Sequence, residues 1–289
     1  MNDHSNPFII DELVRRLSAD MGQISAQGTF MNLYLNGSNK GYYNPTERID
    51  SDFLNSWNGS DSEWDIIAQF GELREGDTVK WNLLKSALKR NLTIPQNYSA
   101  VERLLDIDNF IDYIMLNVYA NTGDWPHNNW YAARKLPDGK WRFMCWDSEW
   151  GIRGGPYKPD TSSYAFIDSG GAYGFGTQRK MFIALLGNPE YREFYQAEVR
   201  RHLGGALSEE NVLRRARQLR DFIADEVTHE YRVRRYNIET WHRKIGEVEE
   251  FGRVAGENFR RWTNDYFAFR NKPLSNHGLA RLQNRAGYR

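Results

Sequence analysis

Asp124, Asn129 and Asp147 are the residues whose types and spacing are best suited to chemistry. The first two lie in a polar loop interrupted by Gly123 and Pro126, and the third follows two strand-like runs. Carboxylate and amide oxygens are hard ligands that suit Mg²⁺ or Mn²⁺, ions that hold phosphates and retain several waters. The three residues therefore predict a metal and phosphate site, provided that the fold brings them together.

A predicted hairpin supplies that convergence. Strand-like runs at residues 130–132 and 141–146 flank the turn residues Pro137 to Gly139, and a helix with an apolar face at three-and-four spacing precedes them at 107–118. Residues equidistant from a hairpin turn face each other. Asn129 is therefore expected beside Trp146 and Asp147, at the end away from the turn, and Asp124 can fold over the same place.

The order of these three residues is typical of protein kinases. There an Asp of the catalytic loop accepts or orients the proton of the substrate hydroxyl, an Asn five residues later binds one metal, and an Asp after a short hairpin binds the metals that bridge the phosphates. Asp124, Asn129 and Asp147 follow this order. The flanking residues differ from the usual kinase motifs, since Thr122-Gly123 replaces His-Arg and Ser148-Glu149-Trp150-Gly151 follows the last Asp.

The longer pattern resembles the CotH kinase family, atypical kinases first associated with bacterial spore coats. The similar residues are 121–126, 129–130, 141–143 and 146–150, with a second stretch at 35–37, 41–43, 47–50 and 53–54. The resemblance implies an α+β, protein-kinase-like fold of two lobes, with a partial N-terminal lobe and a mainly helical C-terminal lobe. Residues 1–50 would be the rest of the first lobe and the inter-lobe connection, 51–270 the catalytic lobe, and 271–289 a disordered tail.

The same resemblance implies transfer of the γ-phosphate of ATP to Ser or Thr of a protein substrate, with Mg²⁺ or Mn²⁺. Asp124 would be the catalytic Asp, Asn129 and Asp147 would bind the metal, and Glu149 would be a further acid near it. The segment from Tyr42 to Asp50 would join the lobes and meet the adenine. Tyr43 and Glu47 would then bind the nucleotide, while an exposed ion pair between Glu47 and Arg48 is the alternative.

Each of these residues also has a structural explanation. An Asp next to Pro and Gly is more often a turn former or helix cap, and Asn128-Asn129 admits the same interpretation. His127 is within reach of the loop and could be proposed as a general base. We expect it instead to be a partly exposed loop histidine, because the kinase-like order gives that role to Asp124.

The N-terminal part lacks one expected feature. Kinases hold the α- and β-phosphates with a Lys on an early strand, which pairs with a Glu on the following helix. Here the first predicted element is a helix, capped by Asn6, begun at Pro7 and ended at Gly22. Glu12 is the candidate for that Glu, with a solvated helix residue as the alternative. The chain is thus expected to begin inside the N-terminal lobe, with impaired activity.

Composition narrows the class of protein. Lys plus Arg equals Asp plus Glu at 38 each, so no overall field favours nucleic acid or a membrane surface. No apolar run is long enough to predict a membrane span, and no signal peptide is visible. Localisation stays open, although the resemblance suggests a spore coat or an extracytoplasmic place. The single cysteine, Cys145, excludes an intramolecular disulfide and is expected to be a small buried residue.

Further elements follow from local patterns. A second hairpin is predicted at 30–43, a helix at 79–88, a helix capped by Ser208, and a final helix through Trp241 and Trp262. The glycine-rich stretch 151–176 occupies the position of a kinase activation segment, with a surface loop as the alternative. Arginines between 214 and 235 are expected to form a solvated, partly compensated face, with a docking surface for an acidic or phosphorylated partner as the alternative.

Three functions remain open from the sequence. The first is a CotH-like protein kinase, and the second is a catalytically inactive, pseudokinase-like scaffold of a coat or envelope. The third is a metal-dependent phosphohydrolase that shares only the acidic residues, and it predicts phosphate release without a protein acceptor. The intact Asp124, Asn129 and Asp147 favour the kinase, whereas the missing lysine strand favours the scaffold.

Overall fold

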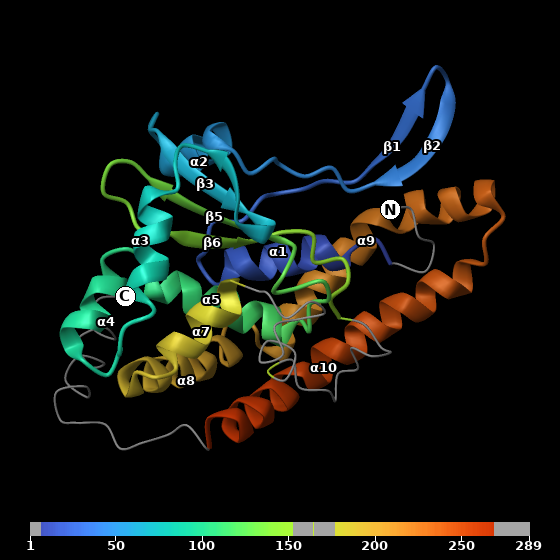
Figure 1. The fold of residues 1–289 in the computed structure, drawn as a ribbon. Helices are drawn as coiled ribbons and strands as arrows, with labels where there is room; N and C mark the ends of the chain where they lie inside the picture. The colour runs from blue at the N-terminus through green and yellow to red at the C-terminus, as the bar shows by residue number, and fades with distance from the viewer. Residues whose placement is uncertain (1–6, 153–163, 165–176, 269–289) are drawn as a thin grey trace.

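The computed structural model describes residues 7–152, 164 and 177–268, which form a mixed α+β fold and confirm the predicted class (Figure 1). The helices are α1 (Ile10–Asp20), α2 (Ser51–Asn58), α3 (Val79–Ala87), α4 (Pro95–Glu102), α5 (Ile107–Tyr119), α7 (Thr177–Leu185), α8 (Pro189–Leu203), α9 (Glu209–Arg234) and α10 (Ile238–Ala268), with a 3₁₀ turn at Gln69–Gly71. The strands are β1 (Met31–Leu35), β2 (Ser38–Tyr43), β3 (Trp64–Ala68), β4 (Glu72–Glu75), β5 (Trp130–Lys135) and β6 (Arg142–Cys145). The expected activation segment and tail lie outside the described residues, apart from positions 151, 152 and 164.

The predicted central hairpin is present as β5 and β6. Trp130 lies opposite Cys145 and Ala133 lies opposite Arg142, so Asn129 falls opposite Trp146, as the sequence predicts. The strands differ in extent from the prediction, since β5 runs on to Lys135 and β6 ends before Trp146. Asn129 and Asp147 are consequently both just outside the ladder, where side chains can leave the sheet.

Strand β3 was not predicted, yet it is central to the four-stranded sheet, whose order is β4-β3-β5-β6. All five of its residues are buried, including Asp65, whose carboxylate lies 2.7 Å from Nε of Arg134 on β5. This ion pair makes a charged residue tolerable inside the sheet. The charge of Asp65 argues against a buried strand in the sequence WDIIA. Its neutralising partner, Arg134, lies 69 positions away and cannot be inferred from the local sequence.

Helix α1 begins later than predicted. Phe8 has a φ of 70° and its ring packs edge-on against Tyr42 at 5.7 Å, so the chain turns before the helix starts. The N-cap is Ile9, and the predicted start at Asn6 and Pro7 is therefore wrong. The helix places Leu13 and Leu17 in the core and packs against α5, α9 and β6.

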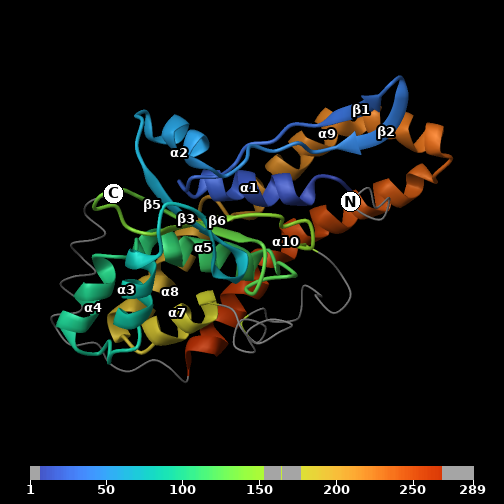
Figure 2. The ribbon, with the colours of Figure 1, turned by 45° about the horizontal axis from the view of Figure 1, so that its top comes forward.

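The hairpin of β1 and β2 confirms the second prediction, although its return strand starts earlier, at Ser38. Asn36 and Gly37 form the two-residue turn with φ values of 51° and 77°, the left-handed pair that such hairpins require. The base of the hairpin lies beside α9 (Figure 2), and its turn points away from that helix (Figure 1). Nδ2 of Asn32 on β1 donates to Oε2 of Glu226 on α9 at 2.7 Å.

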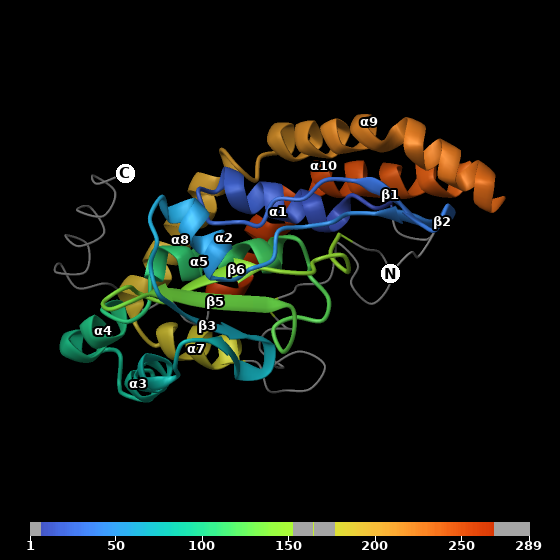
Figure 3. The ribbon, with the colours of Figure 1, turned by 90° about the horizontal axis from the view of Figure 1, so that it is seen from above.

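Helices α9 and α10 run side by side along one flank of the molecule (Figure 3). Ser208 caps α9 by accepting a hydrogen bond from the backbone N–H of Asn211, as predicted. Several arginines of α9 are compensated, since Arg215 pairs with Asp20 and Arg220 pairs with Glu249. Among the described helices, none is both long and apolar enough to cross a membrane.

Candidate active site

Asn129 and Asp147 meet at the open end of the β5–β6 hairpin. Nδ2 of Asn129 donates to the backbone carbonyl of Asp147 at 2.9 Å, which fixes the amide and leaves its Oδ1 without a partner among the described residues. Both residues have positive φ values, 57° and 53°. Asn and Asp tolerate this region better than other side chains, and such backbone strain is concentrated at functional sites.

The loop that carries Asp124 is fastened to the segment after Asp147. The N–H of Gly123 donates to the carbonyl of Trp150 at 3.2 Å, and a side chain at Gly123 would place its Cβ 3.1 Å from Cβ of Trp150. Trp125 is buried, and its Nε1 donates to the hydroxyl of Tyr113 on α5 at 2.6 Å. These contacts hold Asp124 between α5 and the end of the hairpin.

Four acids lie near one another at this place. The pKa of Asp147 is raised to about 6, chiefly because surrounding protein removes part of its hydration, and further because Asp11, Glu149 and Asp124 carry like charge nearby. Neither Asp124 nor Asp147 forms an ion pair with a described Lys, Arg or His. We call Asp11, Asp124, Asn129, Asp147 and Glu149 the acidic mouth. The negative electrostatic potential of its carboxylates favours the binding of a cation.

Asp11 belongs to the acidic mouth and was missed by the sequence analysis. Its Oδ1 accepts a hydrogen bond from the backbone N–H of Ser148 at 2.7 Å, across 137 positions of sequence. Its other oxygen lies 3.4 Å from Nη2 of Arg15. An Asp in the first turn of a helix is common for local reasons, so no pattern in the sequence singles it out.

Glu12 is buried at 2% exposure, and the alternative of a solvated helix residue is wrong. Its carboxylate accepts from Nη2 of Arg15 at 2.7 Å and from Nε of Arg16 at 2.9 Å. Arg15, equally buried, also donates to Asn44 and Thr46. The partners of Glu12 are thus arginines of its own helix, and this network ties α1 to the segment that follows β2.

Tyr43 and Glu47 are held by local contacts with the backbone. Tyr43 is half-exposed on β2 and its hydroxyl donates to the carbonyl of Lys40, while Glu47 accepts from the backbone N–H of Gln27 at 2.8 Å. No contact in the described part joins either residue to the acidic mouth. The alternative, an ion pair of Glu47 with Arg48, is wrong, because Arg48 lies 3.9 Å from Asp50 and Glu47 forms no ion pair among the described residues. Their nucleotide roles stay predictions.

The structure also tests the predictions made for His127 and Cys145. His127 is 5% exposed rather than partly exposed, because the loop folds inward; burial lowers the pKa of its imidazole, while Asp124 opposes this shift. Cys145 is a small buried residue, as predicted, and burial raises the pKa of its thiol to about 12. Neither group is charged near neutral pH.

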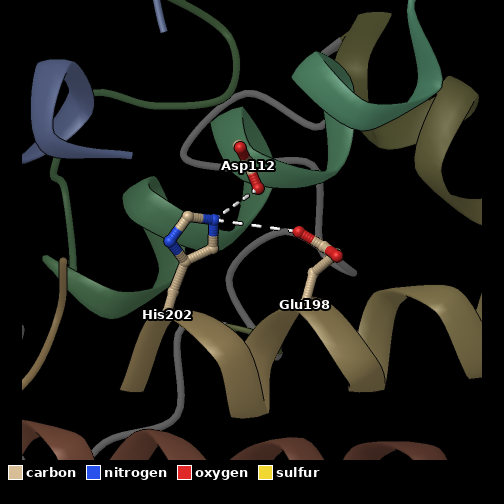
Figure 4. Close-up of side chains that lie close together, drawn as sticks. All are labelled: Asp112, Glu198 and His202. Atoms are coloured by element: carbon tan, nitrogen blue, oxygen red, sulfur yellow. Dashed lines mark hydrogen bonds and ion pairs between the residues drawn. The ribbon is translucent and has the colours of Figure 1, made fainter. Parts of the chain in front are cut away.

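A second cluster of possible metal ligands lies between α5 and α8. Asp112, Glu198 and His202 have ligand atoms within 4.8 Å of one another (Figure 4). Nε2 of His202 is 2.9 Å from Asp112, and Arg201 contacts all three, with its Nε 2.8 Å from Glu198. Because Arg201 pairs with both carboxylates and Nε2 of Gln23 donates to Asp112 at 2.6 Å, we interpret the cluster as a buried ion-pair and hydrogen-bond network that joins the two helices.

Replacing Asp112 with alanine is expected to lower the free energy of unfolding by about 3 kcal/mol, because it removes one partner from a buried charge network. Urea unfolding at pH 7 measures this. The matched control is Asp221→Ala, which removes an exposed Asp that pairs with Arg220 on the surface, and it should cost less than about 1 kcal/mol. Equal effects in the two variants would contradict the interpretation of the cluster.

Comparison with known proteins adds one finding. The family model described as CotH kinase protein matches residues 1–254, a range that contains the acidic mouth and most of the described helices. No curated protein matches the chain at a significant level.

Proposed function

The chain belongs to the CotH kinase family, and we propose that it is a metal-dependent protein kinase that transfers the γ-phosphate of ATP to Ser or Thr of a protein. The observation that carries the proposal is the contact of Asn129 with Asp147 at the end of the β5–β6 hairpin. In protein kinases, an Asn and an Asp with this order around a hairpin hold the metal ions of the nucleotide.

The donor atoms fit a hard divalent cation. Oδ1 of Asn129 and the carboxylate of Asp147 would hold Mg²⁺ or Mn²⁺, and Glu149 is a further acid beside them. The raised pKa of Asp147 supports this assignment, since it arises first from partial burial and then from the like charges of Asp11, Glu149 and Asp124. When bound, the ion would neutralise charge on the phosphates and orient them.

Asp124 is proposed to orient the acceptor hydroxyl. Its carboxylate would accept the hydroxyl proton as the Ser or Thr oxygen forms a bond to the γ-phosphorus and the bond from that phosphorus to the ADP oxygen breaks. His127 is buried in the same loop and is not assigned this role, because the kinase-like order of the residues gives it to Asp124. Tyr43 and Glu47 are proposed to contact the nucleotide from the connecting segment 42–50.

A catalytically inactive scaffold is the second candidate. Glu12 is the observation that favours it, because its carboxylate is taken up by Arg15 and Arg16 instead of by the lysine that kinases place there. The family association with spore coats suits either candidate, and a coat or extracytoplasmic location is part of the proposal. The lobe boundaries at about residue 50 and about residue 270 also stay predictions.

A thermal-shift measurement tests nucleotide binding, which the kinase candidate requires. We expect ATP with Mn²⁺ or Mg²⁺ to raise the melting temperature of the full chain by several degrees, since ligand at about 100 times its Kd stabilises by about 2.7 kcal/mol. Asp147→Asn should lose this shift, and Asp221→Asn, which changes an exposed acid on α9, should keep it. No shift in the unchanged protein at millimolar nucleotide would contradict nucleotide binding.

A further inference from the structure

A basic pocket lies at the turn end of the β5–β6 hairpin, the end opposite the acidic mouth. Helix α3, helix α4 and the hairpin turn enclose a cavity of about 520 Å³, within the usual range of ligand sites. Lys80, Arg90, Arg103 and Arg134 line it, and Asp138 is the one acid among the described lining residues. We call this cavity the α3–α4 pocket.

Three of these four cations lack an ion-pair partner in the described part of the chain. Lys80, Arg90 and Arg103 form no ion pair with any described residue, although most arginines of α9 and α10 do. Arg134 is different, because its Nε pairs with buried Asp65 and its Nη1 donates to the carbonyl of Pro137 at 2.8 Å. The pocket therefore has a fixed, buried guanidinium at its base and unpaired charges at its more exposed rim.

The basic surface continues across α3. A neighbouring cavity of about 650 Å³ shares Ser86 with the α3–α4 pocket and is lined by three further cations, Lys85, Lys89 and Lys180. None of the three forms an ion pair within the described part of the chain. In a protein with zero formal net charge, this concentration of unpaired cations around one short helix predicts an anionic partner.

The shape and lining of the pocket select the kind of anion. Arginine side chains bind phosphate through paired, charge-assisted hydrogen bonds. Leu83 and Leu104 form an apolar part of the pocket wall, against which aliphatic groups of a ligand can pack. Nucleic-acid sites combine an extended basic groove with aromatic platforms for bases, and the described lining residues of both cavities include no aromatic side chain. A polypeptide with one phosphate and acidic neighbours fits better.

We propose that the α3–α4 pocket binds a phosphorylated Ser or Thr side chain of an acidic polypeptide segment. The pocket is separated from the acidic mouth by the length of strand β5, roughly 20 Å for six residues. It is therefore a docking site distinct from the phosphate-transfer site. Binding at this pocket requires no phosphate transfer. The proposal can therefore be tested whether or not the chain is an active kinase.

Fluorescence anisotropy tests the proposal on the full chain without ATP or metal. The probe is a short, labelled acidic peptide with one phosphoserine, compared with its unphosphorylated twin and with a single-stranded oligonucleotide of equal charge. The test variant is the double substitution Arg90→Glu/Arg103→Glu, at two exposed positions. Arg134 is left unchanged because its loss would leave Asp65 buried and unpaired. The matched control is Arg232→Glu, an exposed arginine in the last turn of α9 that forms no ion pair with a described residue.

The phosphopeptide should bind the unchanged protein and the Arg232→Glu control equally, and should bind the double variant about 100-fold or more weakly, because two charge-assisted contacts are lost. Its unphosphorylated twin should bind about tenfold or more weakly than the phosphopeptide. Equal binding by the double variant and the control would overturn the proposal. Tighter binding of the oligonucleotide than of the phosphopeptide would also overturn it, in favour of nucleic acid.

Discussion

Replacing Asp147 with asparagine is expected to abolish phosphate transfer while making the folded protein more stable above about pH 6. The variant loses the carboxylate that we assign to the metal, and loss of several kcal/mol of charge stabilisation corresponds to at least about 10³-fold in rate. The amide keeps the shape of the side chain. A decrease in activity therefore reports the charge, and not a collapse of the loop.

The stability gain follows from the direction of the pKa shift. The pKa of Asp147 is about 6 in the folded protein and lies above the ordinary value of 3.8, so ionisation of this carboxyl costs the folded state. The contribution of Asp147 to stability is greatest below pH 3.8 and is lost as the pH rises toward 6. Asparagine does not ionise, so the Asp147→Asn variant does not lose stability in this way.

Thermal unfolding from pH 4 to pH 8, without metal, measures this effect. The melting temperatures of Asp147→Asn and the unchanged protein should coincide near pH 4 and diverge above pH 6, with the variant higher. Asp221→Asn, at a position 66% exposed, should follow the unchanged protein at every pH. A lower melting temperature for Asp147→Asn at pH 8 would contradict the account of the acidic mouth.

Replacing Asp124 with asparagine is expected to lower kcat by about 10²- to 10⁴-fold, the usual contribution of a positioned acid or base. The nucleotide-induced rise in melting temperature should persist, because Asp124 is assigned to the acceptor hydroxyl and not to the metal. Steady-state kinetics with a protein acceptor, combined with the thermal shift, separate the two roles.

His127→Gln is the matched control for Asp124→Asn, because this residue lies in the same loop and is the other candidate base. Its buried imidazole is expected to affect folding more than chemistry, so kcat of the folded fraction should change by less than about tenfold. A large decrease in kcat for His127→Gln with a small one for Asp124→Asn would exchange the assigned roles.

The contact of Asn129 with Asp147 could be predicted because it depends on local geometry. A hairpin of known turn position fixes which residues oppose each other, and the observed pairing of Trp130 with Cys145 agrees with that arithmetic. Asp11 could not be predicted in the same way. Its contact with Ser148 joins α1 to the end of the hairpin and depends on how the helix packs, which no local pattern encodes.

The other predictions that differ from the structure do so because of tertiary contacts. Strand β3 carries the charge of Asp65, which only the distant Arg134 makes acceptable. Helix α1 starts at Ile10 because Phe8 turns aside to pack on Tyr42, a tertiary contact that overrides the favourable position of Pro7. Glu12 and His127 are polar in sequence but buried in the fold, and polar residues enter a core only where the surrounding structure supplies partners or neutralises them.

Transfer of radiolabel from γ-labelled ATP to protein tests the central claim most directly. The full chain is incubated with Mn²⁺ or Mg²⁺ and a mixture of candidate acceptor proteins, in parallel with Asp147→Asn and Asp221→Asn. We expect label on Ser or Thr of protein with the unchanged chain and with Asp221→Asn, and none with Asp147→Asn. Equal labelling by Asp147→Asn, or metal-dependent release of phosphate from ATP without any labelled protein, would contradict assignment of the acidic mouth to a protein kinase.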